Sequence, residues 1–120
     1  NMKTPPLFKD IYQFNVLMLN TTKAFPKDFK FSLGDRIKDL SLDALELINN
    51  SVSTPNTQKI ETIDLLIIKF SNIRLLIRLC MDTKCINVEK FAFINEEIER
   101  ILKQLYAWQK AQLKKNTPSR

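Results

Sequence analysis

The chain has 120 residues and lacks histidine altogether, while glycine occurs once and cysteine twice. Histidine is the commonest general base near neutral pH, and it completes the Glu-x-x-His pairs of di-iron helix bundles. Without histidine, the thiols of Cys80 and Cys85 cannot complete a four-ligand zinc site. We therefore expect reduced, structural thiols and predict that the protein is not an enzyme, with no catalytic residue, metal, cofactor or small-molecule substrate.

Long hydrophobic runs are also missing. No apolar stretch reaches the roughly 18 residues that cross a bilayer, and residues 2–6 lack the apolar core of a signal peptide. We expect Asn1, which precedes Met2, to be a residue left by cloning. These features predict a cytoplasmic protein that makes no membrane contact.

The composition that remains is typical of a folded helical domain. Hydrophobic residues make up 44% of the chain and charged residues 27%. At this length a single domain, residues 1–120, buries roughly 65 to 70% of its unfolded surface. Lysine and arginine number 19 against 13 acidic residues, and the resulting net charge of +6 favours an anionic partner.

Apolar residues recur at helical spacing in four segments, at about 5–24, 33–49, 57–83 and 88–115. The apolar stripe of the first segment consists of Leu7, Ile11, Phe14 and Met18, widened by Phe8, Tyr12, Val16 and Leu19. Short turns join the segments, including one at 51–56 that contains Pro55. The pattern predicts an all-α fold, an up-down-up-down four-helix bundle.

Three helix starts carry capping signals. Thr4 precedes two prolines, whose missing N–H groups cost little in a first turn. Ser32 is followed three residues later by Asp35, which predicts a capping box and places Gly34 at the second helical position. A glycine there leaves room for a neighbouring segment to approach closely. Asn87 is the expected N-cap of the last helix.

The third segment carries two apolar stripes on nearly opposite sides. One consists of Ile63, Leu66, Phe70, Ile73, Ile77 and Cys80, and the other of Leu65, Ile68, Leu75, Leu76 and Leu79. A four-helix core covers only one of them, and the chain is too short to place this helix at the centre of a larger fold. We therefore predict that the second stripe is an interface between copies of the chain.

Positive charge gathers in two places, which we take as candidate nucleic-acid-binding surfaces. One is a row on the face of the last segment opposite the core, although charge runs are often only solvated surface. The other is the end of the bundle where the first and third turns meet. The row consists of Arg100, Lys103, Lys110 and Lys114, and the second group of Lys23, Lys27, Lys30, Arg78, Lys84 and Lys90.

Two arginines of the third segment lie between its apolar stripes, one turn apart. Arg78 has Asp82 four residues further on, so an ordinary surface ion pair explains it as well as a function does. Arg74 has no such local acid.

The stretch FPKDFKFSLGDRI at 25–37, followed by an amphipathic helix and by IRLLIRLCMD at 73–82, resembles the accessory variability determinant (Avd) proteins of diversity-generating retroelements. These belong with the four-helix-bundle proteins encoded in intervening sequences of bacterial ribosomal RNA genes. The similarity begins at LFKDIYQF, residues 7–14, and extends to the final helix. The positions that match the family's motifs are Phe25, Pro26, Lys27, Phe31, Leu33, Gly34, Arg36, Ile37, Arg74 and Arg78.

The resemblance implies a pentameric barrel of four-helix protomers that binds RNA or DNA together with the retroelement's reverse transcriptase. Such proteins assist the error-prone copying of a template RNA into cDNA and are not the polymerase. On this basis we expect Arg74 and Arg78 to bind the partner and the residues of the 25–37 motif to be structural. The alternative is a structural homo-oligomer of the ribosomal-intervening-sequence type with no nucleic-acid role.

Overall fold

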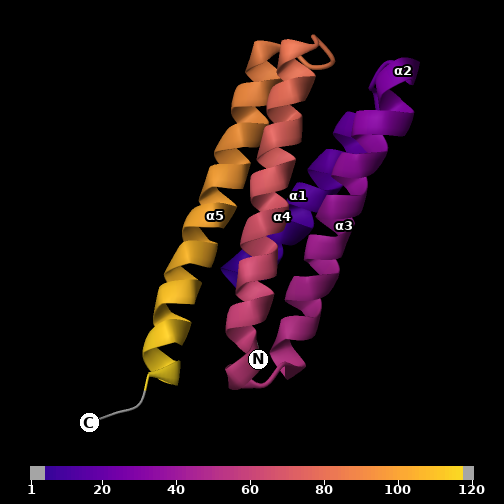
Figure 1. Cartoon of the computed structure of the whole chain (residues 1–120). Coiled ribbons are helices and arrows are strands. Elements are labelled where there is room, and N and C mark those ends of the chain that lie inside the picture. The colour runs from indigo at the N-terminus through magenta and orange to yellow at the C-terminus, as the bar shows by residue number, and fades with distance from the viewer. Residues whose placement is uncertain (1–4, 118–120) are drawn as a thin grey trace.

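The computed structural model describes residues 5–117 as a bundle of helices that run alternately up and down (Figure 1). The elements are α1 (Pro6–Lys23), α2 (Lys27–Phe29), the π-helical turn η1 (Lys30–Gly34), α3 (Asp35–Asn50), the 3-10 turn η2 (Ser51–Ser53), α4 (Asn56–Asp82) and α5 (Val88–Asn116). Because α2, η1 and α3 follow one another without a break, the bundle has four long helices, which confirms the predicted class. No residue between 5 and 117 lies in a β-strand.

Helices α1 and α4 lie at opposite corners of the bundle. Each of them packs against both α3 and α5, so α3 and α5 separate the two. The turn after α1 and the turn after α4 lie at the same end (Figure 1). Within the described part of the chain, no helix is long and apolar enough to cross a membrane.

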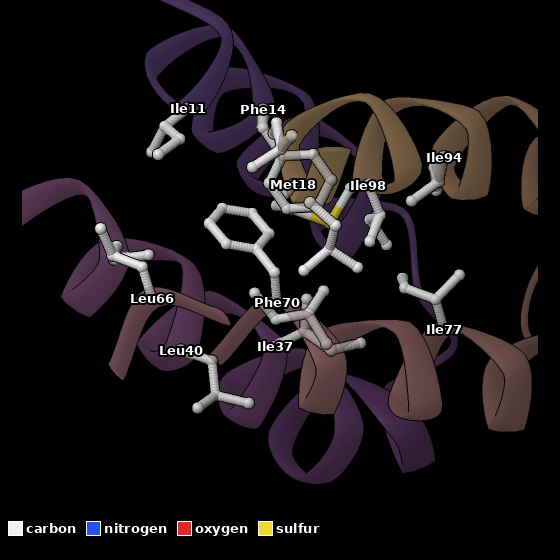
Figure 2. Packing of buried hydrophobic residues seen from close by; sticks show 14 of the residues in the cluster. Ile11, Phe14, Met18, Ile37, Leu40, Leu66, Phe70, Ile77, Ile94 and Ile98 are labelled. Atoms are coloured by element: carbon white, nitrogen blue, oxygen red, sulfur yellow. The ribbon is translucent and has the colours of Figure 1, made fainter. Parts of the chain in front are cut away.

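One hydrophobic core fills the space between the helices (Figure 2). At its centre, Phe14 of α1 and Phe70 of α4 meet edge to face, with ring centroids 5.4 Å apart. The first stripe predicted for α4 is confirmed, because all six of its side chains are fully buried. The buried seam of α5 consists of Ile94, Ile98, Ile101, Leu102 and Leu105.

The second long helix begins earlier than the sequence predicted. Phe25 lies in the connection between α1 and α2, and its side chain is buried. Pro26 follows at the N-cap of α2, where its carbonyl oxygen accepts two backbone N–H groups at 2.9 Å. The fixed φ of proline, −55° here, suits a helix start. The helical backbone therefore begins directly after Pro26.

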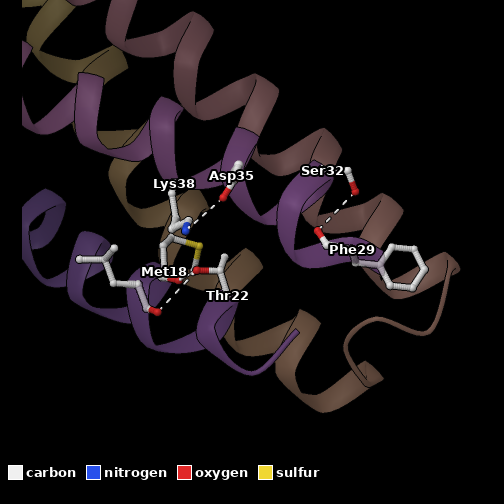
Figure 3. Close-up of polar contacts among 7 residues, drawn as sticks. Met18, Thr22, Phe29, Ser32, Asp35 and Lys38 are labelled. Carbon is white, nitrogen blue, oxygen red and sulfur yellow. Dashed lines mark hydrogen bonds and ion pairs between the residues drawn. The ribbon is translucent and has the colours of Figure 1, made fainter. Parts of the chain in front are cut away.

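The predicted capping box is wrong as a consequence. Ser32 lies inside helical backbone, and its hydroxyl donates to the carbonyl oxygen of Asp28 at 3.1 Å. It also lies 3.4 Å from the carbonyl oxygen of Phe29, the contact drawn in Figure 3. Asp35, the other expected member of the box, forms an ion pair with Lys38, with 3.2 Å between Nζ and Oδ1.

Gly34 is the last residue of η1, not the second residue of a new helix. Its φ of −59° is open to any residue, so conformational freedom does not explain the glycine. A methyl group added there would lie 3.4 Å from Cδ2 of Phe25, 3.5 Å from the carbonyl oxygen of Phe29 and 3.7 Å from Cβ of Thr22. These are ordinary contacts, so alanine fits. The predicted close approach, which would exclude a much larger side chain, stays a prediction.

The other residues of the 25–37 motif divide into packed and exposed ones. Ile37 is fully buried, and Leu33 is half-buried against the core. Arg36 is exposed, and Phe31 is 68% exposed. Phe31, one of the motif residues expected to be structural, therefore lies outside the core, on the outer side of the π-helical turn.

The turn between α4 and α5 follows the sequence signals. Asn87 is the N-cap of α5, as predicted, and its side-chain oxygen accepts the N–H of Lys90 at 2.7 Å. Lys84, with φ of 63°, takes the left-handed conformation common after a helix. Thr4, the predicted cap of α1, lies outside the described residues.

Candidate nucleic-acid and partner surfaces

Helix α5 is fixed on both sides by glutamine side chains. Gln104 donates to Oδ2 of Asp10 in α1 at 2.7 Å, and Gln109 donates to Oδ1 of Asp64 in α4 at 2.7 Å. With its apolar seam turned inward, the helix cannot rotate without breaking these hydrogen bonds. The side of α5 opposite its apolar seam, which Gln104 and Gln109 flank, is therefore directed at solvent.

The predicted basic row lies on that outer face, and Arg100, Lys103, Lys110 and Lys114 are all exposed. Arg100 is engaged by Glu97, with 2.6 Å between Nη2 and Oε2. None of the three lysines has an ion-pair partner within residues 5–117. They span about 16 Å of helix, at 1.5 Å per residue. The row offers three free ammonium groups to an anionic partner.

The second predicted cationic group is spread around one end of the bundle. Its residues come from α1, α2, η1, α4, α5 and the turn before α5, and Figure 1 places these segments at the same end. Arg78 is bound to Asp82, with 3.5 Å between Nε and Oδ2, which confirms the predicted ion pair. Lys30 and Lys90 are half-buried, whereas Lys23, Lys27 and Lys84 are exposed. This end carries dispersed positive charge.

A groove between α4 and α5 holds the two predicted partner-binding arginines. It has a volume of about 570 Å³. Its lining consists of Ser71, Arg74, Leu75, Arg78, Phe91 and Asn95. Arg74 has no ion-pair partner in the described part of the chain. The groove therefore combines apolar side chains with positive charge.

The second apolar stripe of α4 borders this groove and is exposed, as predicted for an interface. Leu65, Ile68, Leu75 and Leu79 are all exposed, and Leu75, at 66%, is the most so. Leu76 is an exception, because it is half-buried and packs against the core. The prediction that Leu76 shares the exposed stripe is wrong for that reason.

A further surface, on α1 and α5, was missed by sequence reasoning. Tyr12, Val16 and Leu19 were expected to widen the core stripe of α1, yet they are exposed at 50%, 43% and 45%. That expectation is wrong because α1 packs mainly against α3 and α5, which cover a narrower face. The apolar residues of α1 occupy a wider arc of the helix than one buried face needs, and this pattern could have indicated a second surface.

Next to these residues is a groove between α1 and α5. It has a volume of about 310 Å³. Its lining consists of Gln13, Phe14, Val16, Leu17, Asn20, Phe93 and Glu97. The one charged residue of this lining, Glu97, is the ion-pair partner of Arg100.

The two cysteines are free and lie near the end of α4. Burial raises the pKa of the Cys80 thiol to about 12, and the neighbouring Cys85 adds to this shift. Burial also raises the pKa of Cys85, although its hydrogen bond with Cys80 acts in the opposite direction. At neutral pH both groups are protonated thiols, which are poor nucleophiles.

The structure defines the chain as an all-helical four-helix bundle with exposed apolar and cationic surfaces. In comparisons of the sequence, no protein-family model matches the chain and no curated protein matches it.

Proposed function

We propose that this chain is a non-enzymatic accessory protein of a diversity-generating retroelement, which binds template RNA or cDNA and the cognate reverse transcriptase. The observation that carries the nucleic-acid part is the row of free lysines on the outer face of α5. Phosphates neutralised by such a row release counterions, which favours binding without regard to base sequence. The retroelement and its polymerase enter the proposal through the resemblance of residues 25–37 and 73–82.

Salt-dependent binding tests the nucleic-acid part. Replacing Lys103, Lys110 and Lys114 with glutamine should weaken binding to single-stranded RNA and DNA of any sequence. The slope of log affinity against log salt should fall by about 0.7 for each phosphate that is no longer neutralised. The measurement is fluorescence anisotropy over a salt series.

A matched control removes three positive charges from other helices. The variant with Lys9, Arg36 and Lys59 replaced by glutamine has the same net charge as the row variant, and none of these three residues has an ion-pair partner within residues 5–117. If both triple variants weaken binding equally, the effect comes from net charge, and α5 is not the binding surface.

Self-association is the second part of the proposal, and the exposed apolar stripe of α4 supports it. The number five comes from the family resemblance, and a pentamer of 14.1 kDa chains has a mass of 5 × 14.1 = 70.5 kDa. Light scattering at micromolar concentration measures this mass, and a monomer would contradict the proposal. Ile68→Glu should dissociate the assembly while leaving the helical circular dichroism unchanged, because Ile68 is outside the core.

The reverse transcriptase is the protein partner in this proposal. The assembled parent protein should retain the cognate polymerase in a pull-down. If it retains neither the polymerase nor nucleic acid at low salt, the accessory role is wrong. A structural oligomer of the ribosomal-intervening-sequence type then takes its place.

A further inference from the structure

We propose that Cys80 and Cys85 form an oxidation site, a dithiol that closes to a disulfide across the turn between α4 and α5. The oxidant is a low-molecular-weight disulfide, the chemical class to which oxidised glutathione belongs. The site depends neither on nucleic-acid binding nor on self-association. It makes the end of α4 responsive to the balance of thiols and disulfides around the protein.

The backbone of the turn brings the two cysteines together. Helix α4 ends at Asp82, and Lys84 takes the left-handed conformation with φ of 63°. The N–H of Lys84 donates to the carbonyl oxygen of Met81 at 3.0 Å, and the N–H of Cys85 donates to that of Cys80 at 2.8 Å. These two hydrogen bonds define a Schellman motif, in which the side chains of the first and last residues contact each other. Cys80 and Cys85 occupy those two positions.

The separation of the two Cα atoms suits a disulfide. A Cα atom lies about 2.4 Å from its own carbonyl oxygen and about 1.5 Å from its own nitrogen. The hydrogen bond of 2.8 Å between the two cysteines therefore holds their Cα atoms within about 6.7 Å of each other. Disulfides span Cα separations of about 4.4 to 6.8 Å. The turn can close without a movement of the helices.

The side chains meet in the way that the backbone motif requires. A hydrogen bond joins the thiol groups of Cys80 and Cys85. Cys80 is fully buried, whereas Cys85 is half-buried. A Schellman motif usually places an apolar contact here, and this chain places its two cysteines there instead. The thiols are thus next to each other, and one of them is accessible.

Thiol–disulfide exchange begins at Cys85, because burial shields Cys80. The Cys85 thiolate attacks one sulfur of the small disulfide, whose S–S bond breaks, so that one small thiol leaves and a mixed disulfide forms. The sulfur of Cys80 then attacks the sulfur of Cys85, and the second small thiol leaves. Each cysteine loses one electron and one proton, and the small disulfide gains two of each.

The closed site would tie the last turn of α4 to the start of α5. Ile86, which is buried, and Asn87, the N-cap of α5, follow Cys85 directly. Exposed Lys84 lies inside the closed loop, at the end of the bundle where the turns after α1 and α4 meet (Figure 1). A disulfide that fits the native turn restricts the unfolded chain, so oxidation should raise the Tm by roughly 3 to 8 °C.

Mass spectrometry of the full chain tests the proposal. After incubation with oxidised glutathione at mildly alkaline pH, the protein should lose two hydrogen atoms and carry no glutathione. It should remain a single chain on a non-reducing gel. Trypsin cleaves after Lys84, between the two cysteines, so digestion of the denatured, thiol-blocked product should yield residues 79–84 and 85–90 as one disulfide-linked pair. A reductant should restore both thiols and the original Tm.

A matched control keeps two cysteines and moves one of them. The variant Cys85→Ser with Val88→Cys has its second thiol at a position that is 68% exposed on α5 and outside the Schellman motif. This variant should retain glutathione at position 88, because no second thiol is close enough to displace it. Circular dichroism checks that the variant folds as the parent does.

Three results would overturn the proposal in the parent protein: both thiols stay free, glutathione stays bound, or disulfides join separate chains. A control variant that closes as readily as the parent would also overturn it, since the placement of the cysteines in the turn would then not matter. A Tm that falls on oxidation contradicts it as well, because a disulfide that fits the existing turn does not destabilise the fold.

Discussion

The α1–α3 pair and the α4–α5 pair are built differently. The segment from η1 through α3 buries the small residues Gly34, Ser41 and Ala44, and Gly34 lies beside Thr22 of α1. The α4–α5 pair instead buries branched side chains, and Figure 2 shows Ile77, Ile94 and Ile98 among them. Small residues therefore contribute to the contact of α3 with α1, whereas isoleucine side chains fill the contact between α4 and α5.

The difference predicts different responses to mutation. Where small residues line a buried contact, a much larger side chain has little space to occupy, and a buried polar group has few possible partners. Where branched side chains interlock, removal of volume leaves a cavity. We expect the largest effect at the centre that both pairs share, and smaller effects within each pair.

The shared centre is the pair of phenylalanine rings. Phe70 is fully buried and its ring meets Phe14, so Phe70→Ala should lower the free energy of unfolding by about 3 to 5 kcal/mol. Phe31→Ala, at an exposed position, should change it by less than about 0.5 kcal/mol. Urea denaturation measures both. Equal losses of stability would show that Phe70 is not at the centre of the core.

Added volume tests the close approach of α1 and α3. Gly34→Leu should lower the free energy of unfolding by about 1 to 3 kcal/mol through overpacking against Phe25 and Thr22. Gly34→Ala is the control. It should be neutral or stabilise by up to about 1 kcal/mol, because the added methyl group makes ordinary contacts and alanine favours helix. A leucine variant as stable as the parent would contradict the close approach.

Alkaline pH tests the apolar environment of Cys80 on α4. Its pKa is raised to about 12 from the ordinary value of 9.0, so the folded state holds the proton more tightly than the unfolded state. The stability from this group is complete below pH 9 and is lost as the pH rises towards 12. The loss is at most about 1.4 kcal/mol per pH unit. Cys80→Ala should show a shallower decline than the parent in a denaturation series over this pH range.

The smallest effect is expected from a buried hydroxyl between α1 and α3. Ser41 Oγ and Asn15 Oδ1 are buried and have no hydrogen-bond partner within residues 5–117. Helices α1 and α3 are antiparallel, and Gly34 lies beside Thr22. Two turns further along α3, and two turns back along α1, Ser41 is therefore level with Asn15. Ser41→Ala should raise the free energy of unfolding by about 1 kcal/mol or less. A clear destabilisation would show that the hydroxyl is bound in solution.

Much of the fold could be predicted from local sequence, because helical periodicity is a property of neighbouring residues. The bounds of α1, α4 and α5 agree with the predicted segments to within one or two residues. The cap at Asn87 and the pair of Arg78 with Asp82 were also predictable, since each joins residues about one turn apart.

The candidate surfaces were only partly predictable. The row on α5 follows from spacing along one helix, and its exposure is confirmed. The groove on α1 and α5 was not foreseen, because it joins Val16 to Phe93, which are far apart in sequence. The start of the second helix was misplaced because burial of Phe25, a tertiary contact, outweighed the local capping signal of Ser32.

The sequence by itself determined where the long helices form and which of them have apolar residues on two sides, because both depend on a period of 3.6 residues. Tertiary structure alone decided which side of each helix is buried. Neighbours cover one stripe of α4 and leave Ile68 and Leu75 exposed, and they cover one side of α1 and leave Tyr12 and Val16 exposed. The physical reason is that a helix in a four-helix bundle touches two neighbours and the centre, so apolar area beyond that arc stays in water until another surface covers it.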